Sequence, residues 1–307
     1  MNTTKLSAIA LAVFFCAAIP AKAEDPVYFA DANLKAAVVE QLQKTDPTIT
    51  DPTPTDMLAL TELRAHDRGF LSLIGLEKAT ELTYLRLSNN DIDDISPLYG
   101  LIDLTYLNLH YTKISSDNLS TLSSLTSLIH LDLSSNNINN IFDLTNINSL
   151  QYLDLNQNDL SDSDLSALSD LTNLIQLNLG WNNIGDSGLS ALSGLANLAF
   201  LDLRYTNING SGLSELPVPS NLKSLNLGVN NITDISSLAN MTNLTYLTLH
   251  FTGISDISVL SGLVNLRSLY INDNNITDIS HHNCPIISRI ITIGYETGHF
   301  HFAKDFS

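Results

Sequence analysis

The sequence predicts an α/β solenoid, a curved rod of about ten stacked coils, and three features of its repeats support this prediction. The first is a fixed spacing of apolar residues, which in one coil are Leu82, Leu85, Leu87, Ile92, Ile95, Leu98 and Leu101. The second is the period, since the same register begins again after every 22 or 24 residues. The third is the alternation around the second and third leucines, which is typical of a short strand with one buried face. The coils begin at Leu60, Leu82, Leu104, Leu128, Leu150, Leu174, Leu198, Leu222, Leu244 and Leu266.

Each strand is followed by an asparagine where the chain must turn. The amide of Asn90 can both donate to and accept from backbone groups that the bend leaves unpaired. The same residue type recurs at Asn136, Asn158, Asn182, Asn230 and Asn274. We therefore expect an inner ladder of asparagines that joins the coils.

The complete predicted architecture is a leucine-rich repeat horseshoe with a concave parallel β-sheet and convex 3₁₀ or short α segments. The 24-residue coils carry longer convex segments, such as residues 161–171 and 185–195, and the extra residues are expected to form short α-helices there. Because the repeat is continuous, residues 60–283 are predicted to be one solenoid without a domain boundary.

The N-terminal end is predicted to contain a signal peptide and a cap. Residues 1–23 combine Lys5, an apolar run and a small-residue cleavage site, which is typical of a secretory signal rather than a membrane span. We expect a secreted, extracellular product, with a periplasmic location as the alternative. Residues 24–59 are predicted to be a helical cap, in which Asp31 begins a helix whose apolar face covers the first coil. That face is expected to carry Leu34, Val38, Val39 and Leu42.

The chain is strongly acidic, with a formal net charge of −18 for the whole sequence and about −20 once residues 1–23 are removed. Such a charge disfavours nucleic acid and anionic membranes as partners. Asp94, Asp164, Asp234 and Asp256, together with Asp278, are expected to cap convex turns. Calcium binding by Asp91, Asp93 and Asp94, or by Asp162 and Asp164, is an alternative, but no coil carries a recognisable metal loop.

Residues 284–307 are predicted to form a C-terminal β-hairpin cap, with alternating runs at 289–295 and 299–302. A cluster near the C-terminus has zinc-ligand chemistry, namely His281, His282, Cys284, His299 and His301. Their spacing matches no zinc pattern, so no metal or other cofactor is predicted. Cys284 is the single cysteine left after maturation, which excludes an internal disulfide and leaves a free thiol or a bond to another chain.

The 22-residue coils, with their N-x-I-x-D-I-x-x-L core, resemble the internalin-type leucine-rich repeats of bacterial secreted proteins. Residues 29–38, FADANLKAAV, also resemble the helical cap of bacterial repeat proteins. The resemblance implies a protein that binds other proteins, with cell adhesion and virulence as expected roles.

Aromatic and basic residues on the outward side of the strands are the predicted ligand-binding set. Rigid rings give contact area at low entropic cost, as in protein or sugar recognition. With strands about 4.8 Å apart, Tyr84 should lie beside Tyr106 and Trp181 beside Tyr205. The full set is Tyr84, Tyr106, His110, Tyr111, Tyr152, Trp181, Phe200, Arg204, Tyr205, Tyr246, His250 and Phe251.

Three coils replace the asparagine by threonine, at Thr112, Thr206 and Thr252, and each carries a basic residue and an aromatic residue just before it. Either these coils face a ligand, or threonine simply replaces the amide hydrogen bond and the tyrosine fits the strand. Both readings stay open on the sequence alone.

The predicted function is protein–protein interaction by a monomer through its concave aromatic face. A glycan-binding surface and a structural component of the cell envelope are the alternatives. An enzyme is not expected, because no G-x-S-x-G, H-E-x-x-H or phosphate-binding loop occurs and a solenoid offers no deep pocket.

Overall fold

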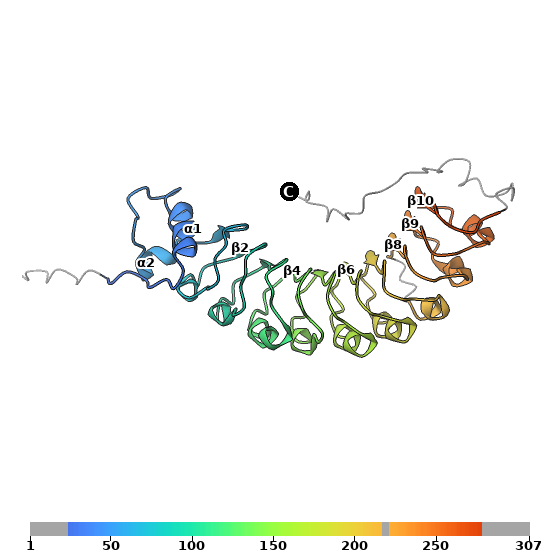
Figure 1. Cartoon of the computed structure of the whole chain (residues 1–307), viewed down its shortest axis with the longest axis horizontal. Helices are drawn as coiled ribbons and strands as arrows, with labels where there is room; N and C mark the ends of the chain where they lie inside the picture. Colours follow the sequence, from blue (N-terminus) through green and yellow to red (C-terminus); the bar gives the residue numbers. More distant parts are fainter. Residues whose placement is uncertain (1–23, 217–220, 278–307) are drawn as a thin grey trace, which may run out of the picture.

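The structure is a computed structural model, and it describes residues 24–216 and 221–277. Within them, ten parallel strands form one sheet in sequence order from β1 to β10. Figure 1 shows the strands on the inner side of one arc and the convex segments on its outer side. The predicted solenoid is therefore confirmed, and its coils stack without a break in the sheet.

Each strand has three residues, and the leucine at its centre points into the core. Leu85 and Leu107, for example, are in register on neighbouring strands, and both are fully buried. The strands are β1 (Glu62–Arg64), β2 (Tyr84–Arg86), β3 (Tyr106–Asn108), β4 (His130–Asp132), β5 (Tyr152–Asp154), β6 (Gln176–Asn178), β7 (Phe200–Asp202), β8 (Ser224–Asn226), β9 (Tyr246–Thr248) and β10 (Ser268–Tyr270).

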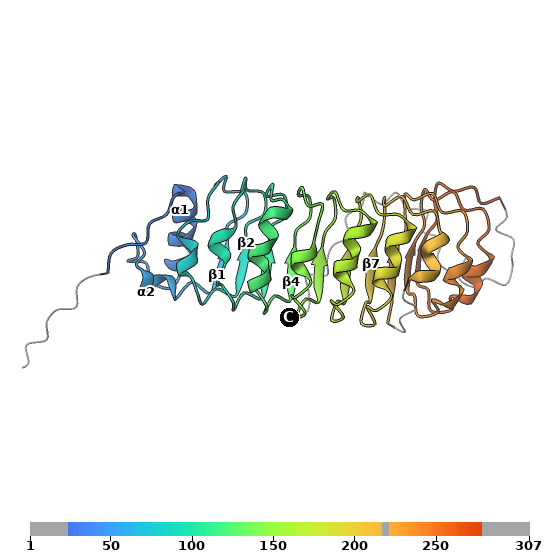
Figure 2. The same ribbon diagram turned by 90° about the horizontal axis from the view of Figure 1, so that it is seen from below.

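The convex segments are 3₁₀-helical in both the 22-residue and the 24-residue coils, so the short α-helices expected in the longer coils do not form. A 3₁₀ segment rises about 2.0 Å per residue against about 1.5 Å in an α-helix, so it spans the outer side of a coil with fewer residues. Figure 2 shows these segments side by side along the rod. They are η1 (Leu76–Lys78), η2 (Ser96–Leu98), η3 (Ser116–Ser124), η4 (Phe142–Leu144), η5 (Asp162–Leu168), η6 (Asp186–Leu192), η7 (Ser211–Glu215), η8 (Ser236–Asn240) and η9 (Ser258–Gly262).

Convex aspartates cap these segments, as predicted. In the shorter coils Oδ1 of Asp94, Asp234 and Asp256 accepts from the N–H two residues later, each at 2.8 Å. Asp164 instead forms a capping box with Ser161 at the start of η5. The carboxylates therefore satisfy backbone donors that the start of a helical turn leaves open.

The N-terminal end is covered by α1 (Ala32–Leu42) and α2 (Pro54–Met57). Asp31 is the N-cap of α1, as predicted, and accepts from the N–H groups of Asn33 and Leu34. The buried face differs slightly from the expected one, because Ala37 is buried and Val39 is only half-buried. The predicted signal peptide, Asp278, Cys284, the C-terminal histidines and the hairpin lie outside the described residues.

The asparagine ladder is present in all six coils that carry it. Each amide nitrogen donates to a carbonyl of its own coil and to one of the preceding coil, as Asn182 does to Leu179 and Leu155 at 2.9 Å each. Each amide oxygen accepts a backbone N–H of the preceding coil, as Asn182 does from Leu160 at 3.0 Å. The bonds of the other five follow the same scheme, at Asn90, Asn136, Asn158, Asn230 and Asn274.

Candidate functional site

The first outward position of the strands carries a pile of rings on β2 to β5, which we call the ring row (Tyr84, Tyr106, His130 and Tyr152). The Tyr84 and Tyr106 rings stack at 4.1 Å with an interplanar angle of 9°, and Tyr106 and His130 stack at 4.4 Å and 11°. His130 and Tyr152 are tilted at 5.7 Å. The stacking of Tyr84 on Tyr106 was predicted, but the insertion of His130 between two tyrosines was not.

The faces of the ring row are largely covered. The Arg64 guanidinium lies 4.3 Å from the Tyr84 ring centre, on which it can make a cation–π contact. Arg64 is itself paired with Glu62. All four rings are half-buried. A partner on the concave side therefore meets the edges of these rings more than their faces.

Burial changes the pKa of two members of the ring row. Desolvation, with a smaller contribution from Tyr84, raises the pKa of Tyr106 to about 12. Desolvation also lowers the pKa of His130, against the weaker attraction of Asp132. Both groups are thus kept neutral at physiological pH, which suits rings that pack against each other.

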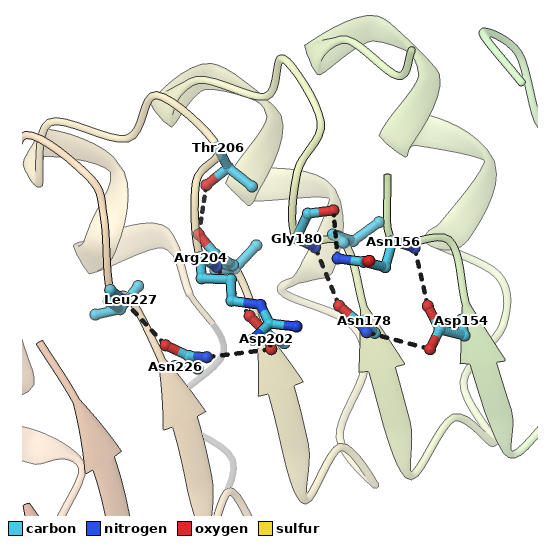
Figure 3. A network of polar contacts seen from close by, with 12 residues as sticks. Asp154, Asn156, Asn178, Gly180, Asp202, Arg204, Thr206, Asn226 and Leu227 are labelled. Carbon is cyan, nitrogen blue, oxygen red and sulfur yellow. Dashed lines mark hydrogen bonds and ion pairs between the residues drawn. The ribbon is translucent and has the colours of Figure 1, made fainter. Parts of the chain in front are cut away.

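The second outward position carries a row of amides and carboxylates that sequence reasoning missed. We call it the polar ladder, and it consists of Asn108, Asp132, Asp154, Asn178, Asp202 and Asn226. Each asparagine donates to an aspartate on a neighbouring strand, at 2.7 to 3.2 Å. Oδ1 of each member, whether amide or carboxylate, accepts the N–H two residues later, as Asp154 does from Asn156. Figure 3 shows the part of the ladder on β5 to β8.

Within the polar ladder, Asp132 and Asp154 are in register on adjacent strands. Burial, and after it the charge of Asp132, raises the pKa of Asp154 well above the ordinary aspartate value. Asp154 is 6% exposed, and its carboxyl group accepts from Asn178 and Asn156. Two carboxylates therefore lie side by side on the floor of the sheet, and holding both ionised is costly.

Replacement of Asp154 by asparagine should make the pH dependence of stability weaker. The unfolded chain loses this proton near the ordinary aspartate pKa of 3.8, whereas the folded protein keeps it to a higher pH. The folded state therefore binds more protons in this window, and the free energy of unfolding of the wild type falls as pH rises through it. The stability of Asp154→Asn relative to wild type should rise from pH 3.8 upward until the folded pKa is passed. Urea unfolding across this pH range measures the difference, and a difference that is constant with pH would contradict the assignment.

Arg204, two residues after the end of β7, lies across the polar ladder. Its Nε is 3.5 Å from Oδ2 of Asp202, and the two side chains are 15% and 3% exposed. The side chain fits because Gly180 has none: a Cβ there would lie 3.1 Å from Cγ of Arg204. Burial raises the pKa of Asp202, while the guanidinium opposes this rise. The pair is thus a buried carboxylate covered by a cation on the concave side.

His110 meets a serine of the next coil, not of its own. Its Nδ1 is 2.8 Å from Oγ of Ser134, and this hydroxyl donates to Asp132 at 2.5 Å. Because serine has one proton, the ring nitrogen is the donor to Oγ. A Ser–His–Asp triad needs the reverse order, with the histidine accepting from the serine and the carboxylate on the histidine. These three residues therefore hold each other in place and do not activate a nucleophile.

The turn that leaves each strand is held at positive φ in all ten coils. We call its residues the exit row, and their φ angles lie between 51° and 59°. The N–H of this residue bonds to the next coil, as that of Trp181 does to the carbonyl of Arg204 at 2.9 Å. The members are Asp67, Asn89, Tyr111, Ser135, Gln157, Trp181, Tyr205, Val229, Phe251 and Asp273.

No member of the exit row is glycine, although a left-handed backbone costs other residues roughly 1–2 kcal/mol. Four predicted site residues occupy it, and their exposed fractions are 59% for Tyr111, 48% for Trp181, 49% for Tyr205 and 57% for Phe251. Trp181 and Tyr205 stack at 4.1 Å with an interplanar angle of 17°. Large exposed rings at strained positions are candidates for binding rather than for stability.

The threonines in the asparagine slot have a structural explanation. Thr112, Thr206 and Thr252 are buried, and each hydroxyl donates to the carbonyl three residues earlier at 2.6 to 2.8 Å. Threonine thus replaces the hydrogen bond that the asparagine amide makes to a carbonyl of its own coil. It has no amide nitrogen that could donate to a carbonyl of the preceding coil. The exposed rings beside these threonines remain candidates, whereas the threonines themselves are core residues.

The other predicted residues lie farther along the sheet. Phe200 is 37% exposed on β7, and Tyr246 is half-buried on β9. Tyr246 contacts the ring of Tyr270, which sequence reasoning missed, at 5.4 Å. His250 is half-buried above Gly228, where a Cβ would lie 2.3 Å from the ring. Apart from Phe200 and Tyr246, which lie on β7 and β9 outside the ring row, the structure groups the predicted set into the ring row, the exit row and basic residues between them.

Among residues 24–216 and 221–277, no group of three or more His, Cys, Asp or Glu side chains is arranged to hold a metal ion. No helix in the same part of the chain is long and apolar enough to span a bilayer.

Comparison with known proteins places these features in context. The protein-family model for the leucine-rich repeat region matches residues 56–306. A crystal structure of internalin InlF from Listeria monocytogenes is 28% identical and has a TM-score of 0.65, with 87% of this chain and 96% of that one covered. Internalin C2 of the same organism is 30% identical with a TM-score of 0.59, over 80% and 94% of the two chains.

The functional domain of InlJ from Listeria monocytogenes shares the fold at 21% identity, with a TM-score of 0.51 over 86% of this chain and 75% of that chain. No curated protein matches the sequence.

Proposed function

This chain belongs to the internalin-type leucine-rich repeat proteins, and from that premise we propose that it is a secreted protein that binds another protein on the concave side of its sheet. The observation that carries the proposal is the pair of stacked, half-exposed rings of Trp181 and Tyr205, held at positive φ next to Arg204. Aromatic residues and arginine are the residue types that contribute most binding energy in protein interfaces. The sequence of residues 1–23 supports secretion, and adhesion to a host or neighbouring cell is the expected role.

The arrangement of the rings favours a protein partner over a glycan. A sugar stacks on the open face of a ring, but Tyr106 lies between Tyr84 and His130, and Arg64 lies over Tyr84. What the ring row offers is edges, hydroxyl groups and the polar ladder beside them. Protein side chains and backbone can use such a mixed surface through hydrogen bonds and edge contacts.

The double substitution Trp181→Asn and Tyr205→Asn should weaken partner binding by about 30-fold or more, because two central aromatic anchors are lost. Folding should be unaffected, since asparagine tolerates positive φ better than aromatic residues do and stands at this position in the coil of Asn89. A cross-linking pull-down from candidate host-cell membranes, followed by titration of the captured protein, measures the loss.

The matched control is Ser135→Asn with Gln157→Asn, which changes two exit-row residues without rings. Equal binding by wild type and both double variants would refute this placement of the site. A saturable signal on a glycan array, with no captured protein, would favour the glycan alternative. Absence of any saturable ligand would favour a structural envelope role.

A further inference from the structure

The exit row contains one continuous apolar segment, over the four successive coils that begin at Leu174, Leu198, Leu222 and Leu244. It consists of Trp181, Tyr205, Val229 and Phe251, and we call it the apolar stripe. The first two and the last are 48%, 49% and 57% exposed, and Val229 is half-buried. The exit row of the two preceding coils carries Ser135 and Gln157, and that of the last coil carries Asp273. The stripe is therefore bounded by polar residues at both ends.

Basic side chains lie directly beside the apolar stripe. The residues that precede its four members are Gly180, Arg204, Gly228 and His250. Each glycine makes room for the basic side chain of the next coil, since a Cβ would come within 3.1 Å of Cγ of Arg204 or 2.3 Å of the His250 ring. Asp202 approaches Arg204 closest at Nε, and a guanidinium has four further N–H donors on its two terminal nitrogens.

Arg204 and His250 lie beside the apolar stripe in a molecule that is acidic overall. Residues 114–203 contain no lysine or arginine and ten aspartates, and the whole chain has a net charge of −18. The eight residues of the stripe and its preceding positions contain no carboxylate, and Asp202, which pairs with Arg204, is only 3% exposed. This surface is therefore complementary to a partner surface that is both apolar and acidic, whereas the acidic remainder of the protein repels such a partner.

The spacing of the stripe fits a helix. Four neighbouring strands place its first and last members about 14 Å apart, at about 4.8 Å per coil. An α-helix brings side chains to one face at i, i+3, i+7 and i+10, which spans about 15 Å at 1.5 Å per residue. Side chains at every second residue of an extended strand are about 6.6 Å apart and fall out of step with the coils.

We infer that the apolar stripe, with Arg204 and His250, is the docking site for an acidic amphipathic helix of the partner protein. The inference rests on the proposed function and names the chemistry of its partner. The apolar face of the helix covers the four exit-row side chains, and its carboxylates meet the guanidinium of Arg204 and the His250 ring. The planar guanidinium of Arg204, whose Nε lies 3.5 Å from Asp202, can bind a carboxylate through two parallel hydrogen bonds from its terminal nitrogens.

The test uses the full mature chain and two synthetic amphipathic helices that differ only in whether glutamate or lysine flanks a leucine face. Trp181 is the single tryptophan of the chain, so its fluorescence reports binding at the stripe. We expect the glutamate peptide to bind at least tenfold more tightly than the lysine peptide at physiological salt. The net negative charge of the protein alone would give the opposite order. Equal affinity, preference for the lysine peptide, or no binding of either peptide would overturn the inference.

The variant Val229→Asp places a carboxylate in the middle of the stripe. Aspartate stands in this position in two other coils, at Asp67 and Asp273, and it tolerates positive φ better than a β-branched residue, so the fold is kept. We expect Val229→Asp to weaken binding of the glutamate peptide at least tenfold. Ser135→Asp, the matched change outside the stripe, should leave its affinity unchanged. Equal effects of the two variants would refute the site. If the captured partner still requires Trp181 and Tyr205 while the glutamate peptide shows no preference, the proposed function stands and the acidic helix is refuted.

Discussion

Replacement of Asn182 by alanine should lower the free energy of unfolding by roughly 3–9 kcal/mol. The buried amide donates to the carbonyls of Leu155 and Leu179 and accepts from the N–H of Leu160. Alanine leaves these three backbone groups in the core without the amide, and each buried group that loses its partner costs about 1–3 kcal/mol. The measurement is urea unfolding followed by circular dichroism.

The chain itself supplies the control for this prediction. Thr206 stands in the same slot of the next coil, and its hydroxyl keeps the bond within its own coil, to Leu203 at 2.6 Å. Asn182→Thr should therefore cost about two thirds as much as Asn182→Ala, because it loses the two bonds to the preceding coil and keeps the one within its own. If the two variants unfold at the same urea concentration as wild type, the ladder does not join the coils as the hydrogen bonds indicate.

The backbone plan of this protein could be predicted from its sequence because one periodic pattern decides it. The leucine spacing fixes which side chains are buried, and the strand spacing then places neighbours such as Tyr84 and Tyr106 side by side. The role of Asn90 and its equivalents followed from the chemistry of an amide at a turn. These features depend on local sequence and on stacking of equal units, so they need no knowledge of long-range contacts.

The site was harder to predict because it depends on contacts between different coils. The outward residues appeared as one concave set, whereas the structure separates a ring row that stacks on itself from an exit row at positive φ. The polar ladder has a signal in the sequence, the N or D between two leucines at Asn108, Asp132 and Asp154. That signal becomes meaningful only once the neighbouring strands are known to pair in register.

The prediction for the longer coils was wrong for a physical reason. Extra residues in 161–171 and 185–195 suggested α-helices, but η5 and η6 remain 3₁₀-helical. Asp162 accepts from the N–H of Gly185, which begins the next convex segment, at 2.5 Å. Bonds of this kind tie the starts of successive segments together, so the stacking, not the helix propensity of each segment, sets the local geometry.

Replacement of Arg204 should also cause a large loss of stability. Variants at Arg204 and Asp202 can then separate the contribution of Arg204 to stability from its contribution to binding. Arg204→Met leaves the carboxylate of Asp202, which is 3% exposed, without its cation. Breaking one side of a buried ion pair costs about 3–5 kcal/mol, because an uncompensated charge stays in the core. Arg204→Met alone should therefore be strongly destabilised at neutral pH, and adding Asp202→Asn should restore most of the loss. Urea unfolding of the two single variants and the double variant gives the coupling energy directly.

The pH dependence provides an independent check on the same pair. Burial already raises the pKa of Asp202 above 3.8 with Arg204 present, and removal of the cation should raise it further. The unfolded chains of wild type and variant titrate alike, so the penalty of Arg204→Met grows as pH rises from the folded pKa of Asp202 in the wild type, above 3.8, and reaches its full value above the folded pKa in the variant. A penalty that stays the same from acidic to neutral pH would show that Arg204 acts through packing over Gly180 and not through charge. Because Asp202→Asn with Arg204→Met should fold normally but lacks the guanidinium, this double variant also tests carboxylate binding without loss of structure.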